Sequence, residues 1–168
     1  STIARSILSD LLAAYRGPVG DLGCGPSDPV DVRRVLGVDS SPAMLAVRRK
    51  RYPGAQGLLL DLERDRLPSS VFDAAIGSLV LDHIDQPRFF LRQARSAIKP
   101  GGKLVLTWFT DSTLPQDKYS DNHFTYSRAD GRQMRTRSRH LPLSEAVAMA
   151  VEEGWKHSMT ARHKLEQN

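Results

Sequence analysis

The sequence is poor in cysteine, with Cys24 as its only one among 168 residues. A single thiol excludes a disulfide framework within the chain and any cysteine-rich zinc site. Metal binding through histidine is also disfavoured, because no two histidines have the spacing of ligands on one helix. The five histidines lie at positions 83, 123, 140, 157 and 163. We therefore expect neither a disulfide nor a bound metal.

Long hydrophobic runs are absent as well. No apolar stretch approaches the ~18–20 residues that a membrane span requires. Residues 1–5 lack the charged and then apolar order of a secretory signal. These absences favour a cytoplasmic location and no role at a membrane. The chain does not begin with methionine, which is compatible with a processed protein or with a fragment.

The excess of positive charge is moderate, at +5, and it is concentrated in residues 128–140. Such a balance says little about partners by itself. With 168 residues and 40% hydrophobic content, the chain is long enough to bury a core of its own. We expect a single domain.

Two short apolar runs that end in acids are the most informative feature. The run at 19–22 contains Asp21 and is followed by Gly23 and Gly25, which let the chain turn sharply and let a ligand approach the backbone. The run at 35–39 ends in Asp39. A nucleoside that lies across two adjacent strand ends can use the amides of the first turn and a carboxylate on the second strand, which binds both ribose hydroxyls.

The same stretch discriminates between two cofactor classes. A dinucleotide site needs Gly-x-Gly-x-x-Gly at the start of a helix that holds a pyrophosphate. Here Asp28 occupies the third glycine position, and an acid repels a phosphate, so NAD is disfavoured. A cofactor that lacks phosphate and carries a cationic amino group tolerates both Asp21 and Asp28. S-adenosylmethionine has these properties.

The runs Asp21-Leu22-Gly23-Cys24-Gly25 and Gly37-Val38-Asp39-Ser40-Ser41-Pro42-Ala43-Met44-Leu45 resemble the class I S-adenosylmethionine-dependent methyltransferases of the small-molecule type. The resemblance covers about residues 15–110. It implies an α/β fold, a Rossmann-like doubly wound sheet with strand order 3-2-1-4-5. One departure is Ser27, which stands where the family usually carries a third glycine. Another is the short connection 26–34, which curtails the helix after the turn.

Periodicity and turn residues place the remaining elements. We expect helices at 2–15 and 42–52, and a third helix capped by Asp85; Arg48 to Arg51 read as a solvated face near a helix end. A further helix begins near Leu143 and is closed by Gly154. Strands are expected at 55–60, 71–78, 103–109 and 155–165.

Residues 111–140 depart from the family pattern. Asp130-Gly131 lies between two alternating runs, at 123–128 and 132–139, which predicts a β-hairpin after strand five. The sheet is therefore shortened at its C-terminal end, or the hairpin substitutes for its seventh strand; the sequence leaves both open. We divide the single domain 1–168 into a cofactor-binding core (1–110), an inserted loop and hairpin (111–140) and a closing helix and strand (141–168).

The resemblance also implies a set of site residues. For S-adenosyl-L-methionine these are Asp21, Gly23, Cys24, Gly25, Asp39, Ser40, Met44, Asp61, Leu62, Ser78 and Leu79. For catalysis they are His83, as a general base, and Asp82. His83 has a competing structural role, in which it bonds a backbone carbonyl. Cys24 is not expected to be a nucleophile. The segment after strand five lies on the acceptor side, which suggests Trp108, Tyr119, His123, Tyr126 and Arg137 as substrate residues.

Three functions follow from these features. The favoured one is a methyltransferase that acts on a small-molecule acceptor. The second is a methyltransferase on RNA or a carrier-bound substrate, with the arginines of the hairpin on phosphates; aromatic residues are sparse among them, so nucleic acid is possible but not favoured. The third is a non-catalytic domain that binds S-adenosylmethionine or a protein partner. The acceptor atom and the oligomeric state stay open.

Overall fold

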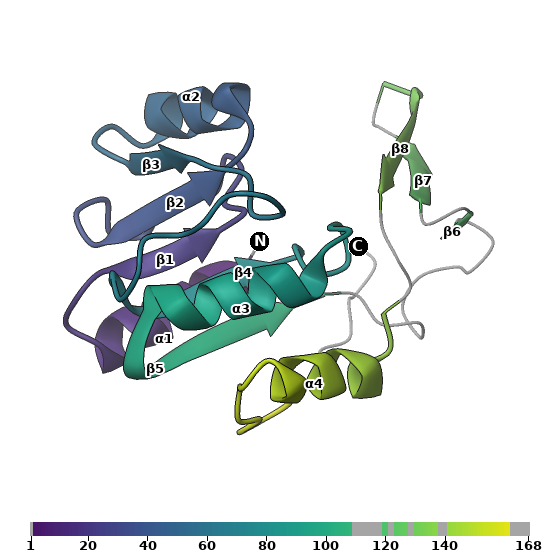
Figure 1. The fold of residues 1–168 in the computed structure, drawn as a ribbon. Coiled ribbons are helices and arrows are strands. Elements are labelled where there is room, and N and C mark those ends of the chain that lie inside the picture. Colours follow the sequence, from purple (N-terminus) through teal and green to yellow (C-terminus); the bar gives the residue numbers. More distant parts are fainter. Residues whose placement is uncertain (1, 109–118, 121–122, 128–129, 138–140, 162–168) are drawn as a thin grey trace.

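The computed structural model describes residues 2–108, 119–120, 123–127, 130–137 and 141–161. Its centre is a parallel sheet of five strands in the order β3-β2-β1-β4-β5 (Figure 1). The strands are β1 (Val19–Leu22), β2 (Val35–Asp39), β3 (Gln56–Leu59), β4 (Phe72–Ser78) and β5 (Ile98–Thr107). This confirms the fold class and the strand order that the sequence predicts.

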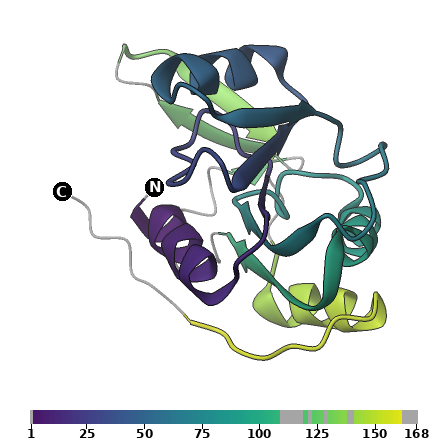
Figure 2. The same cartoon turned by 90° about the vertical axis from the view of Figure 1, so that its left-hand side faces the viewer.

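Helices lie on both faces of this sheet (Figure 2). They are α1 (Thr2–Ala14), α2 (Pro42–Arg51), α3 (Pro87–Ala97) and α4 (Leu143–Glu152). Leu8 and Leu11 of α1 pack against Val35 of β2. Gly37 lies on the same face of β2 and is covered by the Arg48 side chain of α2. Phe90 of α3 belongs to the larger core on the opposite face.

Two of the crossover connections contain no helix. Residues 23–34, between β1 and β2, and residues 60–71, between β3 and β4, form only turns, bends and irregular chain. Parallel neighbours are usually joined by a helix that covers the sheet. The half of the sheet formed by β2 and β3 therefore has fewer helices over it than the half formed by β4 and β5.

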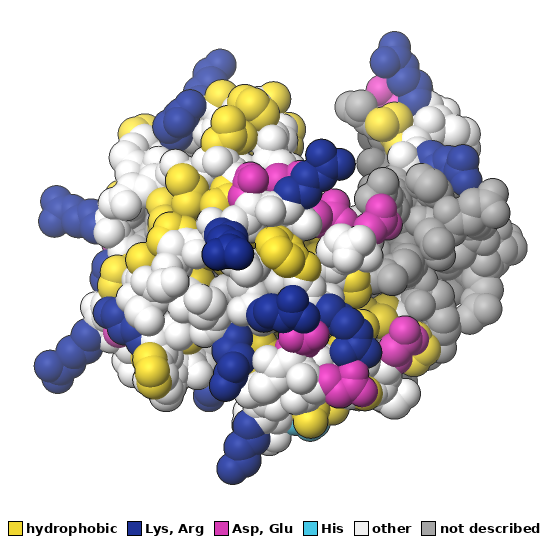
Figure 3. Space-filling model, in the orientation of Figure 1, with side chains coloured by type: hydrophobic (Ala, Val, Ile, Leu, Met, Phe, Trp, Pro, Cys, Tyr) yellow, Lys and Arg dark blue, Asp and Glu magenta, His cyan; other side chains and the backbone are white. Residues whose placement is uncertain are grey.

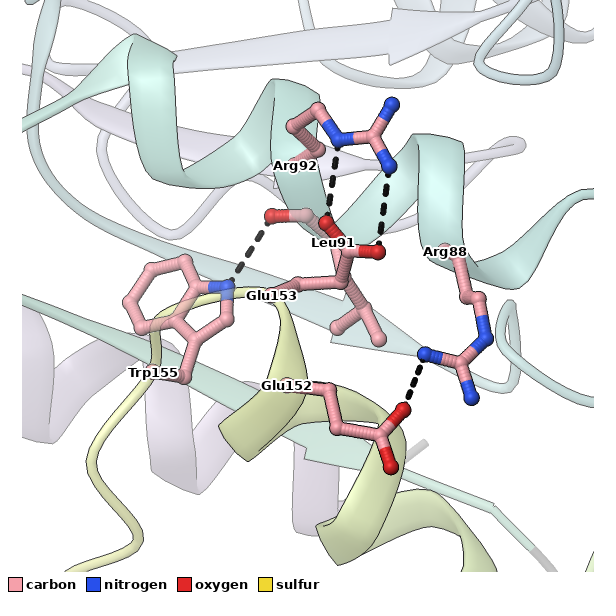
Figure 4. Close-up of polar contacts among 6 residues, drawn as sticks. All are labelled: Arg88, Leu91, Arg92, Glu152, Glu153 and Trp155. Atoms are coloured by element: carbon pink, nitrogen blue, oxygen red, sulfur yellow. Dashed lines mark hydrogen bonds and ion pairs between the residues drawn. The ribbon is translucent and has the colours of Figure 1, made fainter.

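Helix α4 packs against α3 and is held there by polar contacts at its end (Figure 4). The indole Nε1 of Trp155 donates to the carbonyl of Leu91 at 2.9 Å. The Arg92 guanidinium binds both oxygens of Glu153, and a second ion pair joins Arg88 and Glu152. Because these ion pairs are exposed, the packing of buried residues such as Ala146 and Met149 contributes most to the attachment.

The predicted hairpin is confirmed, but it does not extend the main sheet. Strands β7 (His123–Ser127) and β8 (Gln133–Arg137) pair antiparallel around Gly131, and β6 (Tyr119–Ser120) pairs with β7. They form a separate sheet of three strands that projects away from the core (Figure 1). The possibility that the hairpin replaces a strand of the main sheet is therefore wrong.

Three further expectations are corrected. Residues 155–161 are irregular, so a strand at 155–165 is wrong over that part, while 162–165 lie outside the described residues. The N-cap of α3 is Gln86, which makes no side-chain cap hydrogen bond, rather than Asp85. Arg48 is 1% exposed and does not belong to a solvated face.

Candidate functional site

A cavity of about 330 Å³ opens at the carboxyl ends of β1 to β4. Ligands of open α/β sheets bind at this edge, where the strand order reverses. The cavity is lined by Gly23 at the start of the glycine loop (residues 23–28), by the end of β2, and by the segments that follow β3 and β4. The lining residues are Gly23, Asp39, Ser40, Leu60, Asp61, Leu62, Glu63, Leu79, Val80, His83 and Ile84. Six of the predicted cofactor residues are among them, together with the predicted base.

The glycine loop turns as the sequence predicts. Gly23 and Gly25 have φ values of 72° and 51°, in the left-handed region that favours glycine. A Cβ on Gly23 would collide with Cγ2 of Val80. The amides of Gly23 and Cys24 both donate to the carbonyl of Val38, at 2.7 and 3.0 Å, which ties the start of the loop to β2. Backbone hydrogen bonds therefore fix the start of the loop.

Asp39 connects the two strand ends. Its Oδ2 accepts from the amide of Gly25 at 2.9 Å, and its Oδ1 accepts from the amide of Ser41 at 2.9 Å. An ionised carboxylate has about four acceptor positions, so each oxygen keeps one for a further donor. Asp39 is half-buried and lines the cavity. This arrangement suits a ligand that presents two neighbouring hydroxyl groups.

Asp21 lies beneath the loop and does not line the cavity. It is 4% exposed, and its Oδ2 accepts from Oγ of Ser27 at 2.9 Å. Burial raises the pKa of the Asp21 carboxyl, while the Ser27 hydrogen bond and the charge of Arg48 oppose that rise. Ser27, the departure from the family pattern, thus fits the loop and partners the buried acid.

Cys24 is buried and lies close to β2. Its Sγ would be 2.7 Å from a Cβ on Gly37. Burial, reinforced by Asp21, raises the pKa of the Cys24 thiol to about 12. The thiol stays protonated near neutral pH, which agrees with the expectation that Cys24 is not a nucleophile.

The remaining predicted cofactor residues are spread around the site. Gly25 contributes its amide to Asp39, Met44 is 37% exposed on α2, and Oγ of Ser78 lies 3.1 Å from Oγ1 of Thr107. None of these three lines the cavity. Asp61 and Leu62 do line it, and Leu62 is buried. An acid and an apolar side chain thus stand together after β3.

The segment after β4 forms the opposite wall. Leu79 has φ 56°, a left-handed conformation that costs a non-glycine residue about 1–3 kcal/mol and that gathers at functional sites. Its amide donates to the carbonyl of Thr107 at 2.8 Å. The structure also brings together the two predicted catalytic residues, with His83 Nε2 3.8 Å from Oδ1 of Asp82. The Asp82 side chain is 2% exposed and that of His83 is 33% exposed.

The predicted acceptor residues are less well located. Nε1 of Trp108 donates to the carbonyl of Leu141 at 3.0 Å, so this indole supports the chain just before α4. His123 and Arg137 are register partners across β7 and β8, and Tyr119 and Tyr126 lie on β6 and β7. The side chains of these four residues lie outside the described part. Their role in acceptor recognition stays a prediction.

Sequence reasoning missed several residues of the site. Leu60, Glu63, Val80 and Ile84 line the cavity beside predicted neighbours. The Glu63 carboxylate accepts from the amide of Asp85, which links the segment after β3 to the one after β4. An acid two positions after Asp61 was a usable signal for Glu63. Val80 had none, because its contact with Gly23 depends on the fold.

The donor set of this structure fits S-adenosylmethionine. Asp39 keeps acceptor positions for two hydroxyls, and Asp61 with Leu62 offers an acceptor and an apolar surface for a base. The acids Asp21, Asp39 and Asp61 make the site favourable for a cation and unfavourable for a phosphate. A cavity of about 330 Å³ is within the usual range for a small-molecule site.

Comparisons with known proteins agree with this assignment. A family model described as "Methyltransferase domain" matches residues 20–106. A trans-aconitate 2-methyltransferase of Variovorax paradoxus is 28% identical over 159 residues, 88% of this chain and 54% of that protein. An uncharacterized 37.1 kDa protein in transposon TN4556 of Streptomyces fradiae is 33% identical over 114 residues, 61% of this chain and 33% of that protein. The chain thus spans about a third to a half of the length of these relatives.

Among solved structures, the DhpI–SAM–HEP complex has a TM-score of 0.69 and 23% identity, over 96% of this chain and 83% of that chain. At this identity the likeness shows the fold, which agrees with the observed strand order. The family model covers more than half of the chain and includes the glycine loop, Asp39 and the segment after β4. The chain therefore belongs to the class I S-adenosylmethionine-dependent methyltransferases.

Proposed function

We propose that this protein is an S-adenosylmethionine-dependent methyltransferase that acts on a small-molecule acceptor. The observation that carries the proposal is the convergence of Gly23, Asp39 and Asp61 on one cavity. These three come from three different strand ends, and together they supply the turn, the ribose acceptor and the adenine acceptor that the cofactor needs.

When bound, S-adenosylmethionine supplies a methyl group that its sulfonium has already activated. The protein then has to align the acceptor, exclude water and, where the acceptor carries a proton, remove it. Asp39 would hold the ribose, while Leu62 would pack against the adenine and Asp61 would accept from its amino group. Leu79 and Val80 would close the wall above Gly23.

His83 is the candidate for proton removal. Its imidazole lines the cavity, and its Nε2 lies 3.8 Å from Oδ1 of the buried Asp82 carboxylate. A base that stands beside such a carboxylate can accept a proton from an acceptor hydroxyl or amine. The competing role, in which the imidazole bonds a backbone carbonyl and holds this segment in place, stays an alternative.

Two observations support a small-molecule acceptor. One relative is named for methylation of trans-aconitate, a small molecule. Figure 3 shows Lys and Arg side chains scattered singly over the described part of one face, with acidic side chains among them. A nucleic-acid surface would show a continuous basic stripe. The described part of this face carries no such stripe, which favours a small acceptor there.

None of the helices within the described residues has the length and hydrophobicity of a membrane span. A cytoplasmic location remains part of the proposal and rests on the low cysteine content of the chain.

The test is a methyl-transfer assay with S-adenosylmethionine that reads out S-adenosylhomocysteine. Small molecules of a cell extract and bulk RNA are offered separately as acceptors, after ligands that co-purify have been identified by mass spectrometry. We expect product with the small-molecule fraction. Product with RNA alone would favour the second candidate. Cofactor binding without product in either fraction would indicate a non-catalytic domain.

A further inference from the structure

The connection between β1 and β2 lacks the helix that usually covers such a crossover. Residues 23–34 form only turns and bends, although the two strands are parallel neighbours. One face of β2 beside the glycine loop must therefore be buried by side chains from another element. Two side chains lie there, the Cys24 thiol and the guanidinium of Arg48 from the following helix α2.

Arg48 is one of the largest fully buried side chains, with 1% exposure. Its Nε donates to the carbonyl of Ser27 at 3.1 Å, and its Nη1 donates to the carbonyl of Gln56 at 2.8 Å. The guanidinium also lies over Gly37, where a Cβ would be 2.5 Å from Nη1. One side chain thus joins the glycine loop, the middle of β2 and the start of β3.

A buried guanidinium is costly, so its presence in this position needs an explanation. Two of its nitrogens are used on backbone carbonyls, while Nη2 is buried without a hydrogen-bond partner among the described residues. An apolar side chain of similar length would fill the same space without this cost. What it would not supply is the bond to Ser27 and a positive charge beneath the loop.

The contact at Ser27 reaches the cofactor site. Ser27 accepts from Arg48 through its carbonyl and donates through its hydroxyl to Asp21. Arg48 also lowers the pKa of Asp21, against the effect of burial. The two hydrogen bonds hold the end of the loop in one conformation, and the charge of Arg48 offsets part of the cost of burying the acid. A lysine has a single nitrogen and cannot reach two carbonyls with a fixed fork.

We infer that Arg48 is a positioning residue, which holds the glycine loop in its ligand-binding conformation in place of the absent crossover helix. This inference rests on the proposed function for its consequence in cofactor binding, but the restraint on the loop is a property of the protein alone. Arg48 does not line the cavity and is not a catalytic residue.

The first experiment measures backbone amide hydrogen exchange without any ligand, in the wild type, Arg48→Met, Arg48→Lys and the control Arg49→Met. Arg49 is the exposed neighbour on α2. We expect the amides of Gly25 and Ser27 to exchange about tenfold faster in Arg48→Met, which corresponds to the loss of one charge-assisted hydrogen bond. Arg48→Lys should be intermediate. Amides of β4 such as Ile76 should keep their rates.

The second experiment measures the Kd of S-adenosylhomocysteine by calorimetry for the same four proteins. We expect about a tenfold weaker Kd for Arg48→Met, partial rescue by Arg48→Lys and no change for Arg49→Met. If Arg48→Met does not fold, the comparison between Arg48→Lys and the wild type decides, because the lysine loses one of the two carbonyl bonds.

The outcomes separate the two proposals. If the wild type does not bind S-adenosylhomocysteine, the proposed function fails, and the exchange of Gly25 and Ser27 still decides the role of Arg48. Unchanged exchange in the loop, or faster exchange by the same factor throughout the core, would overturn the inference and leave Arg48 as a filler. Faster exchange confined to the loop with an unchanged Kd would overturn its role in cofactor binding.

Discussion

The two halves of the sheet are built differently. The half with β4, β5, α3 and α4 is an apolar core, in which Phe72, Phe90 and Leu91 are almost completely buried and the ion pairs lie on the surface. The half with the glycine loop, β2, α2 and β3 buries the charged groups Asp21 and Arg48, and a third buried charged group, Asp82, lies after β4 beside the cavity. The first half has the composition of a stabilising core, and the second has that of a binding site.

This difference predicts which substitutions should change the free energy of unfolding and which should change ligand affinity. A change in the α3–α4 half should alter the free energy of unfolding and leave ligand affinity intact. A change among the buried charges should alter affinity, and its effect on stability can have either sign, because a buried charge opposes folding.

The largest expected effect on stability is in the α3–α4 half. Phe90→Ala removes a completely buried ring and leaves a cavity, so we expect a loss of about 3–5 kcal/mol in the free energy of unfolding. Urea denaturation measures it, with Phe89→Ala, a half-buried neighbour on α3, as the control. The Kd of S-adenosylhomocysteine should not change in the folded protein. A loss no larger than that of the control would contradict this description of the core.

The buried acid should show the opposite behaviour. Burial raises the pKa of Asp21 in the folded state above its value in the unfolded chain, so the ionised form disfavours folding, and stability falls as pH rises through the folded pKa. Asp21→Asn keeps a group that can accept from Ser27 but removes the charge. We expect a higher Tm than the wild type at pH 7.5 and a smaller difference at pH 4.5.

Differential scanning calorimetry at several pH values tests this, with Asp10→Asn as the control, because Asp10 is exposed on α1. The same substitution should weaken cofactor binding if the charge under the loop matters. A lower Tm at every pH would show that the contacts of Asp21 stabilise the fold more than its burial destabilises it.

The smallest effect is expected at the surface of the α3–α4 half. Arg92→Gln removes both hydrogen bonds to Glu153, but the Arg92 side chain is 62% exposed, so solvent screens the pair. Because the pair is bidentate and the Glu153 side chain is 12% exposed, we expect a loss in Tm of at most about 2–4 °C. A larger decrease would mean that the polar contacts in Figure 4, rather than the buried residues of α4, hold this helix in place.

The sequence predicted the strands of the sheet better than the helices and side chains that pack on its faces. Apolar runs that end in Asp21, Asp39 and Asp61 identify strand ends, because the runs are too short for helices and the acids follow at once. They also identify most of the cavity, since carboxyl ends of parallel strands share one edge. The hairpin was readable from Asp130-Gly131, a local signal.

Arg48 was not predictable in the same way. It stands in the run Arg48-Arg49-Lys50-Arg51, and only one member of this run is buried. Which arginine is buried depends on the space over Gly37, where no crossover helix lies. The local sequence around Arg48 does not encode that space. The contact of Trp155 with the carbonyl of Leu91 on α3 likewise joins residues that are far apart in the sequence.

The central claim is that S-adenosylmethionine binds across the glycine loop with its ribose on Asp39. Calorimetric titration of S-adenosylhomocysteine into the wild type, Asp39→Ala and the exposed control Asp10→Ala tests it most directly. Because the ribose would lose charge-assisted hydrogen bonds of about 1.5–3 kcal/mol each, we predict that Asp39→Ala weakens binding at least about tenfold while Asp10→Ala binds like the wild type. An equal Kd for wild type and folded Asp39→Ala would contradict the claim.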